Sequence, residues 1–238
     1  HLYRGGTDER ERMTMDQIHI MALGAHPDDI ELSMAGLMLR FKAIGARITW
    51  VVATDGAAGN GGRNADLAAQ RALEAAESAK LAGAELVMLG FPDGLLAEQA
   101  GALAAIGQVM RENRIDLVIT HGPSDYHADH RALSRCVANV LPLGTPLLFA
   151  DNLLGVGSTP NLLVDISNMF ETKSACLACH RSQASNTAIE ALEVWNRFRG
   201  LQSAPQHFRY AEAYQTAARL GSNPLTVLDK LAGYSLVA

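Results

Sequence analysis

Two short segments of the chain each combine a histidine with a metal-binding partner three residues away. His26 precedes Asp29, and His127 precedes His130. Residues three apart share one face of a helix, so both members of a pair can reach a single ion. Imidazole and carboxylate groups suit zinc, and a catalytic zinc keeps three protein ligands and one water. Two histidines and one aspartate would fit that pattern, which leaves Asp28 and His127 free for proton transfer.

The segments that hold these residues follow predicted strands. Apolar runs of strand length alternate with longer helical patterns, which indicates βαβ units and a parallel sheet with helices on both faces. We expect strands at 18–23, 48–53, 85–89 and 116–120, and helices at 30–44, 65–82, 95–113 and 129–140. Ligands of such sheets bind outside the carboxyl ends of the strands. The polar segments after strands one, two and four therefore converge at one edge.

The later part of the chain is less regular. Short strands are expected at 146–150 and 161–166, and helices at 168–182 and 188–199. We predict an α/β fold, a Rossmann-like three-layer α/β/α arrangement with a mostly parallel sheet and a C-terminal extension. Residues 16–238 would form one domain, in which 151–238 is the extension that shapes the substrate pocket. Residues 1–15 are polar and charged, and we expect an expression tag or a flexible N-terminus there.

Composition narrows the class of protein. The chain has 238 residues with 48% hydrophobic and 19% charged residues, which is ordinary for a soluble globular protein. A formal net charge of −5 argues against a nucleic-acid or anionic-membrane partner. No apolar run reaches the 18 residues that a membrane span needs. Three cysteines are too few and odd in number for a disulfide framework, so we expect a cytoplasmic protein.

Other patterns have ordinary interpretations. A single aspartate at a helix start is more often an N-cap than a ligand, although the whole set is hard to explain that way. Cys176-Leu177-Ala178-Cys179-His180 matches a haem-attachment pattern, but that chemistry belongs to exported proteins, and two half-buried helix cysteines are the expected outcome. The glycine-rich stretch 56–62 lacks the lysine of a P-loop and is expected to be a loop at the mouth of the site. His121 is left outside the predicted set, and His19 is expected to be structural.

These residues carry a resemblance to a known family, the LmbE-like or PIG-L family of N-acetylglucosaminyl deacetylases, which includes the deacetylases of mycothiol and bacillithiol synthesis. The similarity covers roughly residues 18 to 215. Its specific motifs are Ala25-His26-Pro27-Asp28-Asp29 and His127-Ala128-Asp129-His130. Supporting positions are Gly36, Thr54-Asp55-Gly56, Gly59, Arg71, Glu74, Pro92-Asp93-Gly94, Lys173, His180-Arg181-Ser182-Gln183 and Ala211-Glu212-Ala213-Tyr214.

The resemblance implies a role for each matching residue. The zinc ligands would be His26, Asp29 and His130. Asp28 would be the general base that takes a proton from the attacking water, and His127 would steady the oxyanion or protonate the leaving amine. Asp129 is a plausible partner that fixes an imidazole from outside the ligand set. Residues expected to bind substrate are Arg71, Asp93 and Tyr126.

Two positions depart from the family pattern. In the motif that here reads His127-Ala128-Asp129-His130, the family often has Gly before the first histidine and Pro after it. Tyr126 and Ala128 stand there instead, and they alter the loop that admits the substrate. The implied reaction is hydrolysis of an amide by a zinc-activated water, with Fe²⁺ or Co²⁺ as alternative metals. The expected partner is a small N-acetylglucosamine-type molecule or glycoconjugate, and a homo-oligomer is possible. The alternatives are an amidase of the same family that cuts a larger thiol- or sugar-conjugate amide, and a non-catalytic Rossmann-like binding protein.

Overall fold

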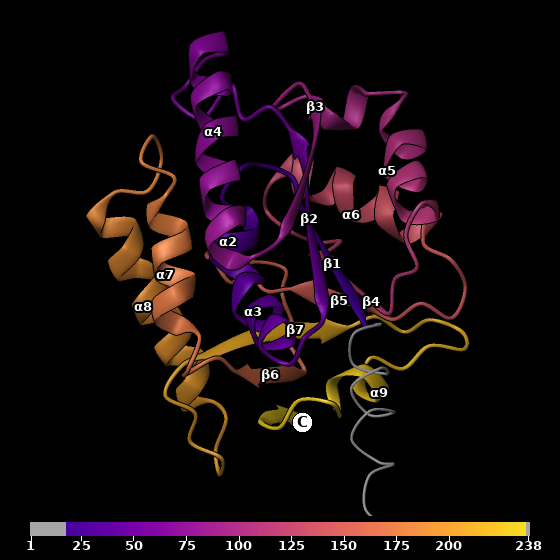
Figure 1. Cartoon of the computed structure of the whole chain (residues 1–238), viewed down its shortest axis with the longest axis vertical. Coiled ribbons are helices and arrows are strands. Elements are labelled where there is room, and N and C mark those ends of the chain that lie inside the picture. The colour runs from indigo at the N-terminus through magenta and orange to yellow at the C-terminus, as the bar shows by residue number, and fades with distance from the viewer. Residues whose placement is uncertain (1–17, 237–238) are drawn as a thin grey trace, which may run out of the picture.

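The central element of the computed structural model, which describes residues 18–236, is one eight-stranded sheet (Figure 1). The strand order is β3-β2-β1-β4-β5-β7-β6-β8. Its strands are β1 (His19–Gly24), β2 (Arg47–Thr54), β3 (Glu85–Phe91), β4 (Leu117–His121), β5 (Leu147–Ala150), β6 (Leu162–Asp165), β7 (Ala211–Thr216) and β8 (Tyr234–Leu236). The expectation for residues 1–15 falls outside the described residues.

Helices cover both faces of this sheet (Figure 1). Their bounds are α2 (Asp29–Ser33), α3 (Ala35–Ala43), α4 (Ala65–Ala82), α5 (Ala102–Arg111), α6 (Ala128–Val140), α7 (Phe170–Ala178), α8 (Asn186–Leu201) and α9 (Leu225–Leu228), with a 3-10 turn η1 (Leu96–Glu98). A hydrophobic core lies on each face of the sheet. Alternate residues of β1 contribute to one core or the other, because successive side chains of a strand point to opposite faces. Ile20 packs with α3 and α4, whereas Met21 packs with α5 and α6. The predicted three-layer fold is confirmed.

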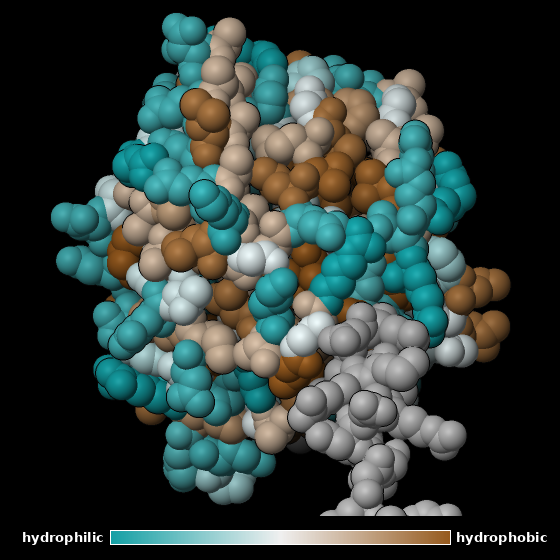
Figure 2. All heavy atoms as spheres, viewed as in Figure 1, coloured by the Kyte–Doolittle hydropathy of each residue, from teal (hydrophilic) through white to brown (hydrophobic). Residues whose placement is uncertain are grey.

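The five N-terminal strands are parallel, and the last three are antiparallel to their neighbours. The direction of strand order reverses between β1 and β4, which is the switch point where open α/β sheets bind ligands. Strand β3 lies at one edge, and its residues 86–89 are half-buried. Figure 2 shows apolar side chains gathered over this edge, between α4 and α5. No helix within residues 18–236 is long and apolar enough to cross a bilayer.

Two predicted helices are wrong in their continuity. The helix expected over 30–44 is interrupted at Met34, where φ is −133°, and forms α2 and α3 instead. The helix expected over 95–113 forms η1, a turn around Gly101 and the shorter α5. The C-terminal strands β7 and β8 and the short helix α9 were not predicted, because these segments carry little periodic pattern.

A buried carboxylate explains the break between α2 and α3. Glu212 of β7 accepts hydrogen bonds from the backbone N–H groups of Gly36 and Leu37, at 2.7 and 2.8 Å, and so caps the new helix start. The same carboxylate pairs with Lys173 at 2.6 Å and accepts the Tyr214 hydroxyl at 2.6 Å. A Cβ at Gly36 would lie 2.6 Å from Ile166 and 2.9 Å from Glu212, so only glycine allows this approach. The C-terminal extension is thereby fixed to the helix that follows the first motif.

Candidate metal centre

The carboxyl ends of all five parallel strands carry polar side chains at one edge of the sheet. His26 and Asp29 follow β1, and the segment 121–130 ends β4 and opens α6. Asp93 follows β3, and Asp151 follows β5 directly. Strands β1 and β4 are adjacent, so the two specific motifs meet at the switch point.

Three of these side chains form a nearly equilateral triangle. His26 Nδ1 lies 3.3 Å from Asp29 Oδ2 and 3.3 Å from His130 Nε2. His130 Nε2 lies 3.3 Å from Asp29 Oδ1. Tetrahedral ligands at the usual zinc distances of about 2.0–2.1 Å lie about 3.3–3.4 Å from one another. Each imidazole nitrogen is close to a different oxygen of the Asp29 carboxylate, so the two nitrogens and this carboxylate fit one side of a zinc coordination sphere. All three side chains are buried.

The charges of the triangle suit a cation. Burial lowers the pKa of each histidine, but the carboxylates of Asp29, Asp129 and Asp93 together outweigh it and hold the pKa of His26 well above the ordinary value. The same carboxylate and that of Asp125 raise the pKa of His130 to about 9. Burial opposes ionisation of Asp29, yet His130, His121 and His26 hold its pKa well below the usual range. Positive charge is thus favoured between these groups, and a divalent ion could take the place of the protons.

Carboxylates stand behind both imidazoles. His26 Nε2 lies 3.1 Å from Asp93 Oδ1 and 3.3 Å from Asp129 Oδ2. His130 Nδ1 lies 3.1 Å from Asp125 Oδ1. Metal-bound histidines usually have such a partner on the ring nitrogen that does not face the metal, because it fixes the tautomer and orientation. The predicted position of Asp129 behind an imidazole agrees with this contact, and Asp129 is held in place by the N–H groups of residues 94 and 96.

Asp28 lies beside the triangle in an unusual backbone conformation. Its φ of 117° is rare for a residue with a Cβ, and such strain persists where the surroundings enforce it. Arg71 lies 3.1 Å from the Asp28 carboxylate and also donates to the carbonyls of Pro27 and Gly56. Burial raises the pKa of Asp28 to about 7, although the Arg71 guanidinium pulls it down. A carboxyl group poised near neutral pH can accept or return a proton.

His127 is the N-cap residue of α6 and lies against the rings of His26 and His130. Its ring meets that of His26 edge-on, with 4.6 Å between centroids. His127 Nδ1 accepts the backbone N–H of Asp129 at 3.2 Å, so the neutral ring carries its hydrogen on Nε2. Burial lowers the pKa of His127, as do the neighbouring His26 and His130, which favours that neutral form. The ring can therefore donate a hydrogen bond from Nε2.

The residues predicted to bind substrate have different surroundings. Tyr126 is 44% exposed and lines a cavity of about 50 Å³ beside Asp29 and His130, as its prediction requires. Arg71 is only 3% exposed, and its guanidinium is engaged by protein groups. Asp93 is buried, with one oxygen on His26 and the other accepting the Ala58 N–H at 2.9 Å. The contacts of Arg71 and Asp93 are therefore those of residues that position the site.

Sequence reasoning missed three polar residues near the cluster. His121 stacks on His130 with 3.7 Å between ring centroids, and its Nε2 lies 3.1 Å from Asp29 Oδ2. That nitrogen also accepts the Ala25 N–H at 3.1 Å, which occupies its lone pair and makes it a poor metal ligand. Asp125 stands behind His130, and Asp151 lines the 50 Å³ cavity. All three end or follow a parallel strand, so the rule that located the other residues could have found them.

Two further polar groups lie outside the cluster. The Nε2–H of His180 donates to the Glu31 carboxylate at 2.7 Å inside the protein, and its neighbours Cys176 and Cys179 are free thiols in or beside α7. The two cysteines were expected to be half-buried, but both are buried: Cys176 lies in α7 and Cys179 is the C-cap residue of that helix. His19, also expected to be structural, is buried against Thr49 at 2.8 Å.

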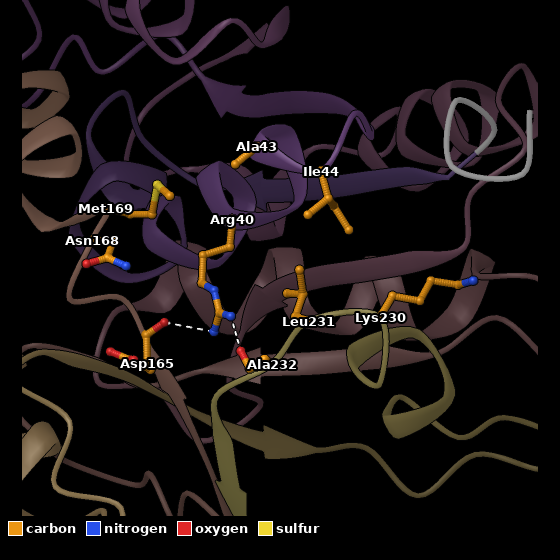
Figure 3. A pocket seen from close by; sticks show the side chains of 9 residues that line it. All are labelled: Arg40, Ala43, Ile44, Asp165, Asn168, Met169, Lys230, Leu231 and Ala232. Carbon is orange, nitrogen blue, oxygen red and sulfur yellow. Dashed lines mark hydrogen bonds between the residues drawn. The ribbon is translucent and has the colours of Figure 1, made fainter. Parts of the chain in front are cut away.

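A separate cavity of about 240 Å³ lies at the other end of α3 (Figure 3). Arg40 projects into it and donates to the carbonyls of Asp165, Ala232 and Gly233. Lys230 lies at its rim, and the Asp165 carboxylate accepts the Ser167 hydroxyl. This cavity lies where the parallel strands begin and contains none of the clustered residues, so we assign the chemistry to the opposite edge.

Two curated proteins are similar to this chain in sequence. A diacetylchitobiose deacetylase of Thermococcus kodakarensis is 26% identical over 215 residues, 81% of this chain and 80% of that protein. A probable N-acetyl-alpha-D-glucosaminyl L-malate deacetylase 2 of Bacillus anthracis is 27% identical over 190 residues, 72% of this chain and 84% of that protein.

Two solved structures share the fold. The N,N'-diacetylchitobiose deacetylase of Pyrococcus horikoshii superposes with a TM-score of 0.74 at 21% identity, over 91% of this chain and 95% of that one. The 4-carboxy-2-hydroxymuconate hydratase GalB of Pseudomonas putida has the same TM-score of 0.74 at 18% identity, over 87% of this chain and 99% of that one. At these identities the likeness concerns the fold alone. The sequence profile of the GlcNAc-PI de-N-acetylases, called PIG-L, matches residues 21–141, and the chain belongs to this deacetylase family.

Proposed function

We propose that this protein is a metal-dependent N-deacetylase that hydrolyses the acetamide of an N-acetylglucosamine-type sugar or glycoconjugate. The observation that carries the proposal is the triangle of His26, Asp29 and His130, with edges of 3.3 Å, flanked by Asp28 and His127. Family membership and the curated relatives support the deacetylase chemistry. A purely structural histidine cluster would have no need of two further titratable groups at its rim.

The three residues of the triangle would hold the metal ion, with zinc as the preferred candidate. A zinc ion held there would polarise the amide carbonyl and lower the pKa of water toward about 7. Iron or cobalt would suit the same imidazole and carboxylate donors. Asp93, Asp125 and Asp129 would orient the two ligand imidazoles through their outer nitrogens.

Asp28 would be the general base. Its pKa near 7 leaves a useful fraction of carboxylate at neutral pH, and Arg71 keeps the side chain in one place. The carboxylate accepts a proton from the attacking water as the carbon–oxygen bond forms. The same proton is then available for the departing amine.

His127 would stabilise the oxyanion, because its neutral ring can donate a hydrogen bond from Nε2 but has no spare proton to give to the leaving amine. Its Nδ1 is fixed by the Asp129 N–H, so the Nε2–H is the group that can donate. Preorganised donors of this kind cost no reorganisation when the oxyanion forms, and the loss of one typically costs about 10²–10³ in rate.

Residues from 151–238 would shape the pocket, as the sequence suggested. Asp151, Asn152, Leu153 and Trp195 line the cavity together with Tyr126. A cavity of about 50 Å³ beside the triangle admits a small substituent. Most of a sugar substrate would therefore lie outside the cavity. Homo-oligomerisation stays a prediction.

Two measurements test the proposal. Purified protein should contain about one equivalent of zinc, iron or cobalt, and His26→Ala should lose it. Acetate release should be detected for at least one N-acetylglucosamine derivative in a panel of glycosides. Metal without acetate release, but with cleavage of a larger thiol- or sugar-conjugate amide, would favour the amidase alternative. Absence of metal together with unchanged ligand binding by His26→Ala would favour the non-catalytic alternative.

A further inference from the structure

Asp151 is a buried carboxylate at the end of the fifth parallel strand. It follows β5 directly, its backbone N–H donates to the Ala213 carbonyl at 3.0 Å, and it is only 3% exposed. Its Oδ2 accepts the indole N–H of Trp195 at 3.1 Å and the Arg199 guanidinium at 2.6 Å from Nη2 and 2.8 Å from Nε. One oxygen of the carboxylate is thus held by two donors of α8.

The other oxygen has no partner. Asp151 Oδ1 is buried and accepts no hydrogen bond from any residue that the structure describes, 18–236. Nearly all buried polar atoms in folded proteins are paired, because an unpaired one has lost its hydration without compensation. An unpaired carboxylate oxygen is therefore suited to a donor that arrives with a bound molecule.

The position of Asp151 ties this residue to the catalytic cluster. Asp151 lines the cavity of about 50 Å³ that Asp29 and His130 also line. A molecule whose amide lies at the triangle therefore brings its neighbouring atoms into reach of Asp151. The cavity is lined mainly by polar side chains, together with Leu32, Leu153 and Trp195. The feature that sets Asp151 apart is its buried oxygen without a hydrogen-bond partner, and polar groups placed in this way fix the orientation of a ligand.

The charge balance indicates which donor fits. Arg199 already neutralises Asp151, so a second cation would add positive charge to a buried pair that has no net charge. A hydroxyl group supplies one donor without charge. Sugars present such hydroxyls next to the N-acyl group. An apolar group at this position would leave Oδ1 unpaired.

We propose that Asp151 is a specificity-determining residue that accepts a hydrogen bond, through Oδ1, from a sugar hydroxyl near the scissile amide. The inference rests on the proposed function and names the part of the substrate that this residue recognises. Hydrogen bonds to a charged group contribute enough to change kcat/KM by about ten- to a hundredfold. Sites built to bind a hydroxyl reject analogues that lack it, because the buried acceptor is then unpaired.

The experiment combines substrate analogues with variants of Asp151. An accepted N-acetylglucosamine glycoside is compared with its 3-, 4- and 6-deoxy analogues, by acetate release. The native protein should lose about ten- to a hundredfold in kcat/KM for one of the three analogues. Asp151→Ala should lose a similar factor on the parent glycoside, mostly through KM, and should show little further loss on that same analogue. Glu171→Gln, which removes an exposed charge on α7, should behave as the native protein does.

Asp151→Asn serves if the alanine variant fails to fold. Its amide oxygen must face Trp195 and Arg199, which only donate, so its NH₂ group takes the place of Oδ1. Its preference for the parent glycoside over that analogue should fall, because the NH₂ group can only donate to the hydroxyl oxygen and this neutral hydrogen bond is weaker than one to a carboxylate. Equal kcat/KM of the native protein for the parent and all deoxy analogues would overturn the inference. It would also be overturned if the variant, tested on the analogue, lost the full product of the factor due to the substitution and the factor due to the missing hydroxyl. Failure of every glycoside to release acetate would instead count against the proposed function.

Discussion

The carboxylate behind His130 offers a sharp test of the metal centre. Asp125→Asn replaces a charged oxygen that lies 3.1 Å from His130 Nδ1 by a neutral amide of the same shape. The amide can still accept the His127 N–H, which Asp125 Oδ1 accepts at 3.0 Å, so the loop need not change. Loss of such an outer partner typically lowers metal affinity by about ten- to a hundredfold, or about 1.4–2.8 kcal/mol.

The structure also predicts an order among the three outer carboxylates. His130 has Asp125 alone behind its ring, whereas His26 has both Asp93 and Asp129. Asp93→Asn leaves a second carboxylate on His26, so its effect on affinity should be smaller than that of Asp125→Asn. We therefore expect less than about tenfold for Asp93→Asn.

The assay is zinc binding by metal-stripped protein in competition with a chromophoric chelator at constant pH. Glu98→Gln, which removes an exposed carboxylate from η1, is the charge-matched control and should stay within about twofold of the parent. Thermal melts of the metal-free proteins check that each variant is folded. A folded Asp125→Asn variant that binds zinc as tightly as the parent would refute the idea that His130 is a ligand oriented by Asp125.

Three other outcomes are expected. Asp28→Ala should keep its zinc and lose about 10²–10⁴ in kcat, since general bases contribute that much, and a normal turnover would exclude Asp28 as the base. Glu212→Ala should lower the free energy of unfolding by about 3–5 kcal/mol, because Lys173 is left charged and buried. Denaturant melts measure this change, and the control Glu85→Gln, at an exposed ion pair, should lower the free energy of unfolding by less than about 1 kcal/mol. Burial raises the pKa of the Cys176 thiol to about 12. At pH 8 its alkylation in the folded protein should therefore be at least about a thousandfold slower than in urea, and the rate should rise with pH. Equal rates in the folded and unfolded protein would contradict this.

Periodicity and turn residues were enough to predict the parallel half of the fold. The helix expected over 65–82 matches α4 residue for residue, because Asn64 caps its start and Gly83 ends it in a left-handed conformation. The break between α2 and α3 could not be read from local sequence, since it depends on Glu212, some 175 residues away. Strands β7 and β8 were not predicted for a similar reason, because their pairing with β5 and β6 is set by the tertiary structure.

The sequence predicted some residues of the candidate site better than others. Spacing and position after strands predicted that His26, Asp29 and His130 lie close together. In the structure their facing nitrogen and oxygen atoms are 3.3 Å apart. Spacing says nothing about which way a side chain turns once it is buried. Arg71 and Asp93 were expected to face substrate, yet each is engaged by the protein around the cluster.

The strand ends explain how one fold can serve different reactions. A hydratase shares this fold with a TM-score of 0.74, so the sheet and its helices do not by themselves select hydrolysis of an amide. Selection must come from the side chains at the carboxyl ends of the strands. In this chain the segments after β1 and β4 supply the triangle, and β5 is followed by Asp151, which lines the same cavity and would recognise the part of the substrate beside the reacting group. The first two ends would then determine the reaction and the fifth would determine the substrate, so exchanging Asp151 should alter which sugar is accepted without abolishing metal binding.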